Sequence, residues 1–271
     1  MSSIHGKKPR VITVANQKGG VGKTTTAINL GTALAAIGER VLIVDMDPQG
    51  NASTGVGLDR AKRERSTYDV LVGNHSLSEV VVNTDVPRLS VAPSTLDLLG
   101  VEMEIASAED RAFRIRKSVE SGVIDTEGVP FDYLLIDCPP SLNLLTINAL
   151  AASQSILVPL QCEFFALEGL SQLLKTVEQV KQTVNPELTI HGIVLTMYDA
   201  RNNLSGQVVA DVRDYMGDKV YKTVIPRNVR VSEAPSYGKP ALLYDFKCSG
   251  SQAYLKLASE VIQRERKLCA A

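Results

Sequence analysis

Two lysines, Lys18 and Lys23, bracket three glycines in the stretch Gln17–Thr26, which reads QKGGVGKTTT. Glycines let backbone N–H groups turn inward around phosphate oxygens, and a helix N-terminus adds partial positive charge at the same place. Lys23 is placed to reach the terminal phosphates of a nucleotide, and the hydroxyl of Thr24 to ligate Mg²⁺. The residue types and their order therefore predict a phosphate-binding loop. A purely structural turn is the alternative, but an apolar run before the loop and a helical pattern after it favour phosphate binding.

Carboxylates suited to the same chemistry end two apolar runs. The run VLIVDMDPQGN places Asp45 and Asp47 two residues apart, so they share one face at the carboxyl end of a strand, where α/β sheets bind ligands. The run FDYLLIDCPPS has the Walker B form and ends in Asp137, whose carboxylate would hold Mg²⁺ through a water beside Thr24. Each motif alone is weak evidence, and the first pair is also compatible with a plain strand end before Pro48. Together with a phosphate loop they favour nucleotide chemistry.

The elements that must position these residues alternate along the chain. The clearest helical spacing runs from Glu163 to Val184, includes Phe164 on its apolar side, and is followed by Pro186. Near-continuous apolar strands alternating with helices indicate an α/β fold, with a doubly wound, mostly parallel sheet of the P-loop NTPase type and helices on both faces. Strands are expected at Val11–Ala15, Val41–Val44, Leu89–Ala92, Tyr133–Ile136, Ser155–Leu160, Ile190–Met197 and Val220–Ile225.

The sequence is typical of one domain. No long Gly/Ser linker, low-complexity tract or internal repeat interrupts it, so we expect a single P-loop ATPase domain over residues 10–271 after a flexible extension of residues 1–9. The charged segment Asp59–Thr67 and the turn Asp125–Pro130 are expected to be surface connections. The apolar spacing of the last helix suits docking on the body of the domain, through Ala253, Tyr254, Leu257, Ala258, Val261 and Ile262.

Composition excludes several classes of protein. Of the 271 residues, 44% are hydrophobic and 22% are charged, and no apolar run approaches the roughly 20 residues of a membrane span. The polar, basic N-terminus has no apolar signal core after it, which predicts a cytoplasmic protein. The cysteines form no C-x-x-C pair, which indicates reduced thiols rather than disulfides or a zinc site. They are Cys138, Cys162, Cys248 and Cys269.

The net charge and the local charge lead to different predictions about nucleic-acid binding. The formal net charge of −1 predicts no nucleic-acid partner. The segment from Lys219 to Lys247, however, holds six basic residues against two acidic ones. Such a patch can bind phosphates, although taken alone it is more often an ordinary solvated face.

The loop departs from the usual G-x-x-x-x-G-K-[ST] spacing, because Gln17 replaces the first glycine and Lys18 stands five residues before Lys23. This K-G-G-x-G-K-T-T arrangement resembles the deviant Walker A motif of the ParA/MinD family of ATPases. The resemblance implies a homodimer that encloses ATP, in which Lys18 contacts the nucleotide of the other subunit; a solvated loop lysine is the alternative. The implied ATP contacts in the loop are Lys18, Gly19, Gly20, Val21, Gly22, Lys23, Thr24 and Thr25.

The same resemblance assigns roles to the carboxylates. Asp47 matches the aspartate that positions and polarises the attacking water, so the implied catalytic residues are Lys18, Lys23 and Asp47. Asp45 is expected to support Mg²⁺ or the phosphate loop, which makes the implied metal-binding residues Thr24, Asp45 and Asp137. No arginine finger in cis is evident. Slow intrinsic hydrolysis is therefore expected, with stimulation by a centromere-binding partition protein of the ParB type.

Two segments of the C-terminal half, LTMYDARNNLS and TVIPRNVRVSEAPSYGKP, are similar to the ParA/Soj branch of chromosome partition ATPases. The resemblance implies adenine contacts by Pro226 and Asn228, largely through backbone and apolar packing. It also implies non-specific, salt-sensitive binding of double-stranded DNA, and with it association with the bacterial nucleoid. The matching basic positions are Arg201 and Arg230 as first choices, Lys239 and Lys247 as second choices, and Arg227, which also suits a structural role.

Three other functions use the same phosphate loop. A MinD-type membrane-cycling ATPase needs a C-terminal amphipathic helix to lie on lipid, whereas the ending QRERKLCAA offers only Leu268 and small residues, so no membrane partner is expected. An electron-transfer ATPase of the nitrogenase iron-protein type needs two cluster cysteines per subunit, and Cys138 and Cys162 show no cluster-loop spacing. A small-molecule ligase or kinase stays open as an alternative, although no sequence pattern indicates a pocket for a second substrate.

Overall fold

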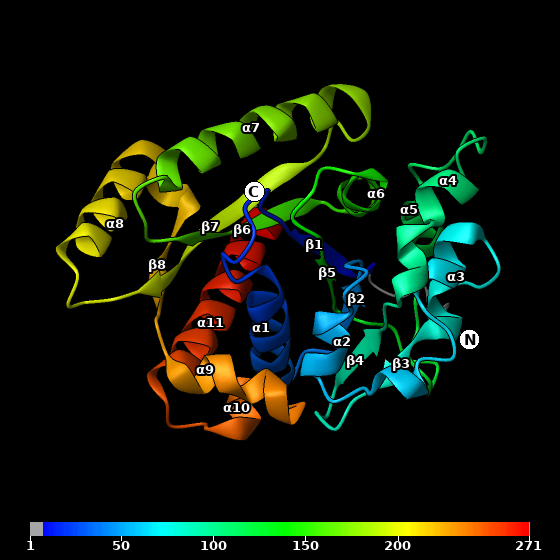
Figure 1. Ribbon diagram of the computed structural model, residues 1–271, viewed down its shortest axis with the longest axis horizontal. Helices are drawn as coiled ribbons and strands as arrows, with labels where there is room; N and C mark the ends of the chain where they lie inside the picture. The colour runs from blue at the N-terminus through cyan, green and yellow to red at the C-terminus, as the bar shows by residue number, and fades with distance from the viewer. Residues whose placement is uncertain (1–7, 271) are drawn as a thin grey trace.

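The computed structural model describes residues 8–270, which form an eight-stranded sheet covered by helices on both faces (Figure 1). The strand order is β3-β4-β2-β5-β1-β6-β7-β8, and all neighbouring strands are parallel except β3 and β4. The strands are β1 (Arg10–Val14), β2 (Val41–Asp45), β3 (Val82–Asn83), β4 (Leu89–Ala92), β5 (Tyr133–Asp137), β6 (Ser155–Gln161), β7 (Thr189–Tyr198) and β8 (Val220–Pro226).

Two groups of helices cover the sheet. Helices α1 and α11 pack together on one face, while α5 to α8 lie on the other (Figure 1). The helices are α1 (Lys23–Ile37), α2 (Asn51–Gly55), α3 (Thr67–Val72), α4 (Val101–Glu104), α5 (Arg114–Glu120), α6 (Leu144–Ala152), α7 (Ala166–Thr183), α8 (Asn203–Met216), α9 (Val229–Glu233), α10 (Ala241–Tyr244) and α11 (Ser249–Ala270).

The centre of the sheet explains why the site forms where it does. Strands β2 (VLIVD) and β5 (YLLID) are buried at every position, as expected for parallel strands with helices on both sides. In the pairing register, Asp137 lies opposite Val14 on one side and Asp45 on the other. The carboxyl ends of three neighbouring strands therefore meet at one edge, together with the glycine-rich turn that follows β1.

Most of the expected elements are confirmed. All seven expected strands are present, and the structure adds β3, which is only two residues long and pairs antiparallel with β4. The helix expected from Glu163 corresponds to α7, which begins at Ala166. The expectation that Phe164 lies on its packed side is wrong, because Phe164 precedes the helix and is 75% exposed. All six apolar residues expected to dock the last helix are buried.

The segment Asp59–Thr67 is largely the surface connection that its charge predicts, because six of its nine residues are exposed, but three are not. Arg63, Ser66 and Thr67 are all buried, because each binds a backbone or capping partner inside the fold. The turn Asp125–Pro130 does lie at the surface, as expected. Cys138, Cys162 and Cys248 are free thiols in the structure. The first seven residues of the expected flexible extension, and the side chain of Cys269, lie outside the described part of the chain.

No helix within residues 8–270 is both long enough and apolar enough to cross a lipid bilayer.

Candidate nucleotide and DNA site

The glycine-rich turn forms an open cradle at the N-terminus of α1. Gly20 and Gly22 have positive φ angles of 76° and 89°, which side chains other than glycine rarely adopt. A Cβ placed on Gly19 or Gly20 would meet no atom within 4 Å, so the space above the turn is free. Gly22 is the N-cap of α1 and provides no side-chain cap, and no acidic residue lies in the first turn. The backbone N–H groups of this turn are therefore available to an anion.

Contacts with neighbouring strands hold the cradle in place. The Thr196 hydroxyl of β7 donates to the Val21 carbonyl at 2.9 Å, and the Lys23 ammonium donates to the Lys18 carbonyl at 2.9 Å. Lys23 is only 7% exposed. Burial lowers the pKa of Lys23, and the nearby Asp137 carboxylate opposes that shift. A buried cation whose neutral partner is a loop carbonyl can exchange that partner for a phosphate oxygen.

Asp137 is buried without a partner of its own. Both of its carboxylate oxygens are enclosed, and neither makes a hydrogen bond of acceptable geometry to any described residue. Burial, and next the charge of Asp45, raises the pKa of Asp137 well above its usual range, while the nearby Thr24 hydroxyl lowers it. An orphaned carboxylate beside a hydroxyl fits a hydrated Mg²⁺. No group of three His, Cys, Asp or Glu side chains within residues 8–270 is arranged to hold a metal.

Asp45 and Asp47 differ in environment although they end the same strand. Asp45 is fully buried, and its Oδ2 accepts hydrogen bonds from the Ser53 amide at 2.8 Å and the Ser53 hydroxyl at 2.6 Å. Burial raises the pKa of Asp45 to about 6. Its Oδ1 accepts from the Asp47 amide at 3.2 Å, so Asp45 organises the turn that carries Asp47. Asp47 itself is half-buried, and its Oδ1 accepts from the Gln49 amide at 2.9 Å.

A cavity of about 210 Å³ opens beside the phosphate loop, lined by Gly22 and Thr25 at one end and by Pro226 and Asn228 at the other. Pro226 and Asn228, the expected adenine contacts, therefore line the same cavity as two residues of the phosphate loop. The Asn228 side chain is already engaged, because it caps α9 and donates to the Ser249 hydroxyl at 3.0 Å.

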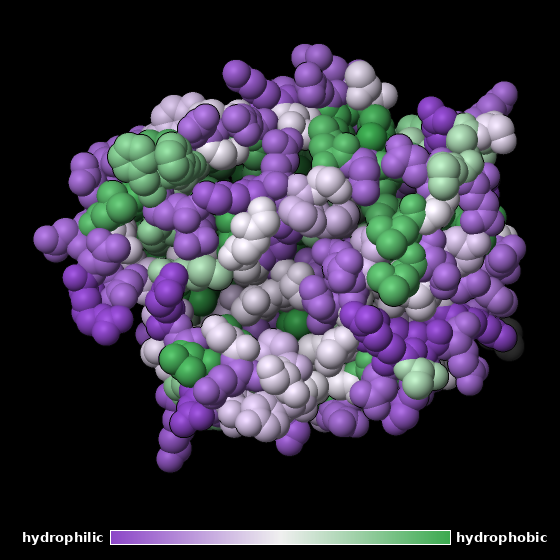
Figure 2. Space-filling model, in the orientation of Figure 1, coloured by the Kyte–Doolittle hydropathy of each residue, from purple (hydrophilic) through white to green (hydrophobic). Residues whose placement is uncertain are grey.

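Lys18 lies at the rim of the cradle and forms an ion pair with Glu163 of the same chain. No local sequence pattern signals this partner, because 145 residues separate the two. Glu163 is followed by Phe164 and Phe165, which pack edge to face at 5.1 Å and are 75% and 58% exposed. Figure 2 shows apolar side chains gathered over the start of α7, as one of several apolar patches on this face.

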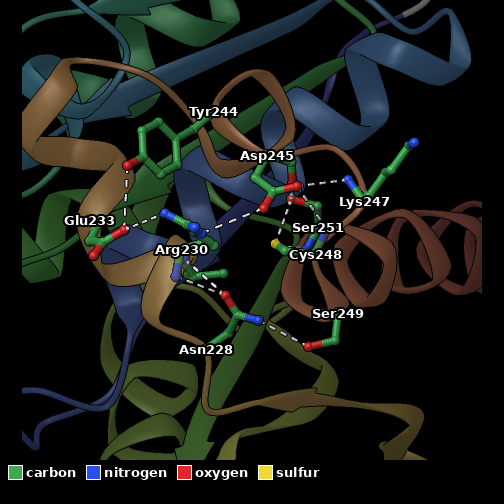
Figure 3. Close-up of polar contacts among 10 residues, drawn as sticks. Asn228, Arg230, Glu233, Tyr244, Asp245, Lys247, Cys248, Ser249 and Ser251 are labelled. Carbon is green, nitrogen blue, oxygen red and sulfur yellow. Dashed lines mark hydrogen bonds and ion pairs between the residues drawn. The ribbon is translucent and has the colours of Figure 1, made fainter.

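Arg230 lies in an acidic setting at the start of α9. Its guanidinium pairs with Glu233 at 3.2 Å and lies 3.6 Å from Asp245, while Tyr244 donates to the same Glu233 carboxylate at 3.3 Å (Figure 3). Arg230 is exposed, with 54% of its side chain accessible. The side chain of Lys247 points away from this cluster in Figure 3. An incoming phosphate would have to compete with two carboxylates for Arg230.

The other expected DNA contacts lie on nearby loops. Arg201 is 88% exposed and forms a bidentate pair with Asp199, at 3.0 and 2.8 Å. The Arg227 amide donates to the Tyr198 carbonyl at 2.8 Å, and Arg227 lines the cavity beside the phosphate loop. The structure therefore places Arg201 and Arg227 at neighbouring strand ends, while Lys239 and Lys247 are exposed on the segment around α10.

Comparison with known proteins identifies the family. A family model described as an AAA domain matches residues 9–190. The chromosome partitioning protein ParA of Caulobacter vibrioides is 62% identical over 257 residues, which cover 95% of each chain. The chain belongs to the ParA/Soj family of chromosome partitioning ATPases. The sporulation initiation inhibitor protein Soj of Bacillus subtilis is 53% identical over 252 residues, which are 93% of this chain and 98% of that protein.

The fold of this ParA/Soj family member is shared with solved structures. The crystal structure of cobyrinic acid a,c-diamide synthase from Mycobacterium smegmatis with bound ADP and magnesium has a TM-score of 0.81 and 36% identity, covering 95% of this chain and 96% of that one. The family resemblance and the P-loop NTPase fold expected from the sequence are thus confirmed. The roles of individual residues stay predictions.

Proposed function

We propose that this ATPase partitions DNA through an ATP-dependent cycle of dimerisation. In the proposed cycle, ATP and Mg²⁺ bind in the cradle, two subunits close face to face, and the closed dimer binds double-stranded DNA without sequence preference. Hydrolysis then separates the subunits and releases the DNA. The observation that carries the proposal is the open phosphate loop with one buried lysine, Lys23, and one lysine at its rim, Lys18.

ATP would lie with its phosphates over Gly19–Lys23 and its adenine in the cavity near Pro226 and Asn228. The free N–H groups of the loop and the ammonium of Lys23 would hold the phosphates. Thr24 and Asp137, with Asp45 behind them, would hold Mg²⁺, which when bound would neutralise charge on the phosphates. The M. smegmatis relative that binds ADP and magnesium supports this assignment.

Asp47 would orient the attacking water. The carboxylate is half-buried, and its backbone amide is fixed by Asp45. Water aligned with the γ-phosphate by one carboxylate is sufficient for slow turnover, because positioning is the main protein contribution to this reaction. A centromere-binding partner of the ParB type would accelerate hydrolysis by adding charge or adjusting the site.

Dimer closure would let each Lys18 reach the nucleotide of the partner subunit. It would also bring two copies of the basic surface, with Arg201 and Arg230 first and then Arg227, Lys239 and Lys247, onto one side of the dimer. Linking two weak phosphate-binding surfaces raises apparent affinity through effective concentration, by up to about 10²–10⁴-fold. DNA binding would then follow the nucleotide state.

A membrane-cycling role of the MinD type has less support. The apolar residues of α11 from Ala253 to Ile262 are buried against the domain and so are not free to lie on lipid. The proposed setting is therefore the bacterial nucleoid in the cytoplasm.

DNA retention with three nucleotides tests the proposal. The protein is incubated with ADP, ATP or a slowly hydrolysed ATP analogue, and its binding to non-specific duplex DNA is measured at several salt concentrations. We expect binding with ATP and with the analogue, little binding with ADP, and a steep loss as salt rises. Equal binding in all three nucleotide states would contradict the proposal.

A further inference from the structure

Arg63 is an arginine that charge alone would place in solvent, yet it is only 8% exposed. It follows the short turn Arg60–Lys62 and lies within the segment that connects α2 to α3. No carboxylate in the described part of the chain lies within ion-pair distance of its guanidinium. Burial lowers the pKa of Arg63, and the field of Asp45 opposes that shift. A buried arginine without an ion pair is costly, so its neutral partners must be well placed.

The guanidinium joins two stretches of the chain, residues 54–58 and Ser94. Nη1 donates to the Ser94 carbonyl at 2.9 Å, and Nη2 donates to the Thr54 hydroxyl at 2.7 Å and to the Leu58 carbonyl at 2.9 Å. It also packs directly on Gly50, where a Cβ would clash with Nη1. The planar fork of an arginine can make such a set of contacts, whereas a lysine ammonium has neither the width nor the fixed geometry.

These contacts continue to Asp47. The Ser94 hydroxyl donates to the Asp47 carbonyl, and the Ser94 amide donates to the Ser53 hydroxyl at 3.1 Å. Ser53 in turn donates its amide and hydroxyl to Asp45, which accepts the Asp47 amide. The Asp47 carbonyl also accepts from the Gly50 amide at 2.8 Å. Both backbone groups of Asp47 are thus fixed by residues that Arg63 holds directly or through Ser94.

We propose that Arg63 is a positioning residue of the ATPase site: it clamps the turn after β2 to the turn after β4 and so sets the direction of the Asp47 carboxylate. The proposal rests on the proposed role of Asp47 in orienting water. Arg63 acts through Ser94 and the Gly50 turn and does not touch the nucleotide.

The test compares Arg63→Met with Arg264→Met, a matched control. Arg264 also donates to several backbone carbonyls, those of His191, Lys219 and Val220, but these belong to β7, β8 and their approaches rather than to the Asp47 turn. We expect Arg63→Met to lower kcat about 10- to 100-fold with little change in KM for ATP or in ATP-dependent dimerisation. Arg63→Lys should recover little of the kcat that is lost in Arg63→Met. Arg264→Met should keep kcat per folded molecule.

Two further measurements keep the proposal falsifiable. Ser94→Ala removes one hydroxyl and leaves Arg63 in place, and it should show the same fall in kcat at unchanged KM; this variant decides the matter if Arg63→Met does not fold. Hydrogen exchange at the Gly50 amide should accelerate in Arg63→Met and not in Arg264→Met. Normal kcat in either Arg63→Met or Ser94→Ala, or parallel loss of kcat, KM and dimerisation, would overturn the proposal. Normal turnover of Asp47→Ala would instead overturn the proposed role of Asp47.

Discussion

The ammonium of Lys18 forms an ion pair with the carboxylate of Glu163 in the same subunit. Their side chains are 42% and 30% exposed, so the pair lies at the rim of the phosphate loop rather than in the core. The proposed dimer needs the same ammonium at the nucleotide of the partner subunit. The internal pair therefore competes with dimer closure, and Glu163 and the exposed Phe164–Phe165 pair would have to rearrange or be covered when two subunits meet.

Removing the competing carboxylate should strengthen the dimer. Glu163→Gln should lower the dissociation constant of the ATP-bound dimer about 2- to 30-fold, because closure breaks one such pair in each subunit and a partly exposed ion pair contributes roughly 0.2–1 kcal/mol. Sedimentation equilibrium with a slow ATP analogue measures the change. Glu168→Gln, on the exposed side of α7, is the control and should have no effect. An unchanged or weaker Glu163→Gln dimer would show that the internal pair does not oppose closure.

Lys23→Ala should weaken ATP binding about 10- to 100-fold, because it removes a charge-assisted hydrogen bond to phosphate. Calorimetric titration with a slow ATP analogue gives the affinity, and Lys175→Ala on the surface of α7 serves as the control. Full ATP affinity in Lys23→Ala would contradict the assignment of the loop.

Asp137→Asn should raise the thermal stability of the unliganded protein and lower the stabilisation that Mg²⁺ gives with ATP. Burial raises the pKa of Asp137, which means that its charged form is disfavoured in the folded protein without ligand at neutral pH. The amide should therefore raise the Tm of the unliganded protein, and each 1 kcal/mol corresponds to roughly 2–4 °C. The extra stabilisation that Mg²⁺ gives in the presence of ATP should be lost. If Mg²⁺ still adds the full shift in Asp137→Asn, the carboxylate does not hold the ion.

Substitutions of Arg230 and of its ion-pair partner Glu233 should change DNA affinity in opposite directions. Arg230→Glu should weaken DNA binding with ATP-dependent dimerisation intact, and the slope of log affinity against log salt should fall by about 1 for each phosphate that Arg230 neutralises. Glu233→Gln should instead tighten DNA binding, because it removes the carboxylate that pairs with Arg230 at 3.2 Å. Filter binding across a salt series measures both. Loss of dimerisation together with DNA binding in Arg230→Glu would make the residue structural.

The local parts of the site were predictable from sequence, and the long-range parts were not. The glycine-rich loop, Asp47 and Asp137 each stand in a short motif at a strand end, where residue order fixes position. Glu163 and Ser94 contact the site from segments remote in sequence, and no local sequence pattern predicts these contacts. The burial of Arg63 could not be predicted for a related reason. A run of charged residues normally indicates a solvent-exposed segment, and the carbonyl that allows the guanidinium to be buried comes from the turn after β4.

In the proposed cycle, ATP joins two copies of this chain, and a variant that hydrolyses ATP very slowly tests that step most directly. Asp47→Ala should bind ATP and keep it long enough for the mass of the ATP-bound state to be measured. Sedimentation velocity of Asp47→Ala with ATP and Mg²⁺ should show a dimer, and the same protein with ADP should show a single copy. A single copy with ATP, even at high protein concentration, would contradict the ATP-joined dimer.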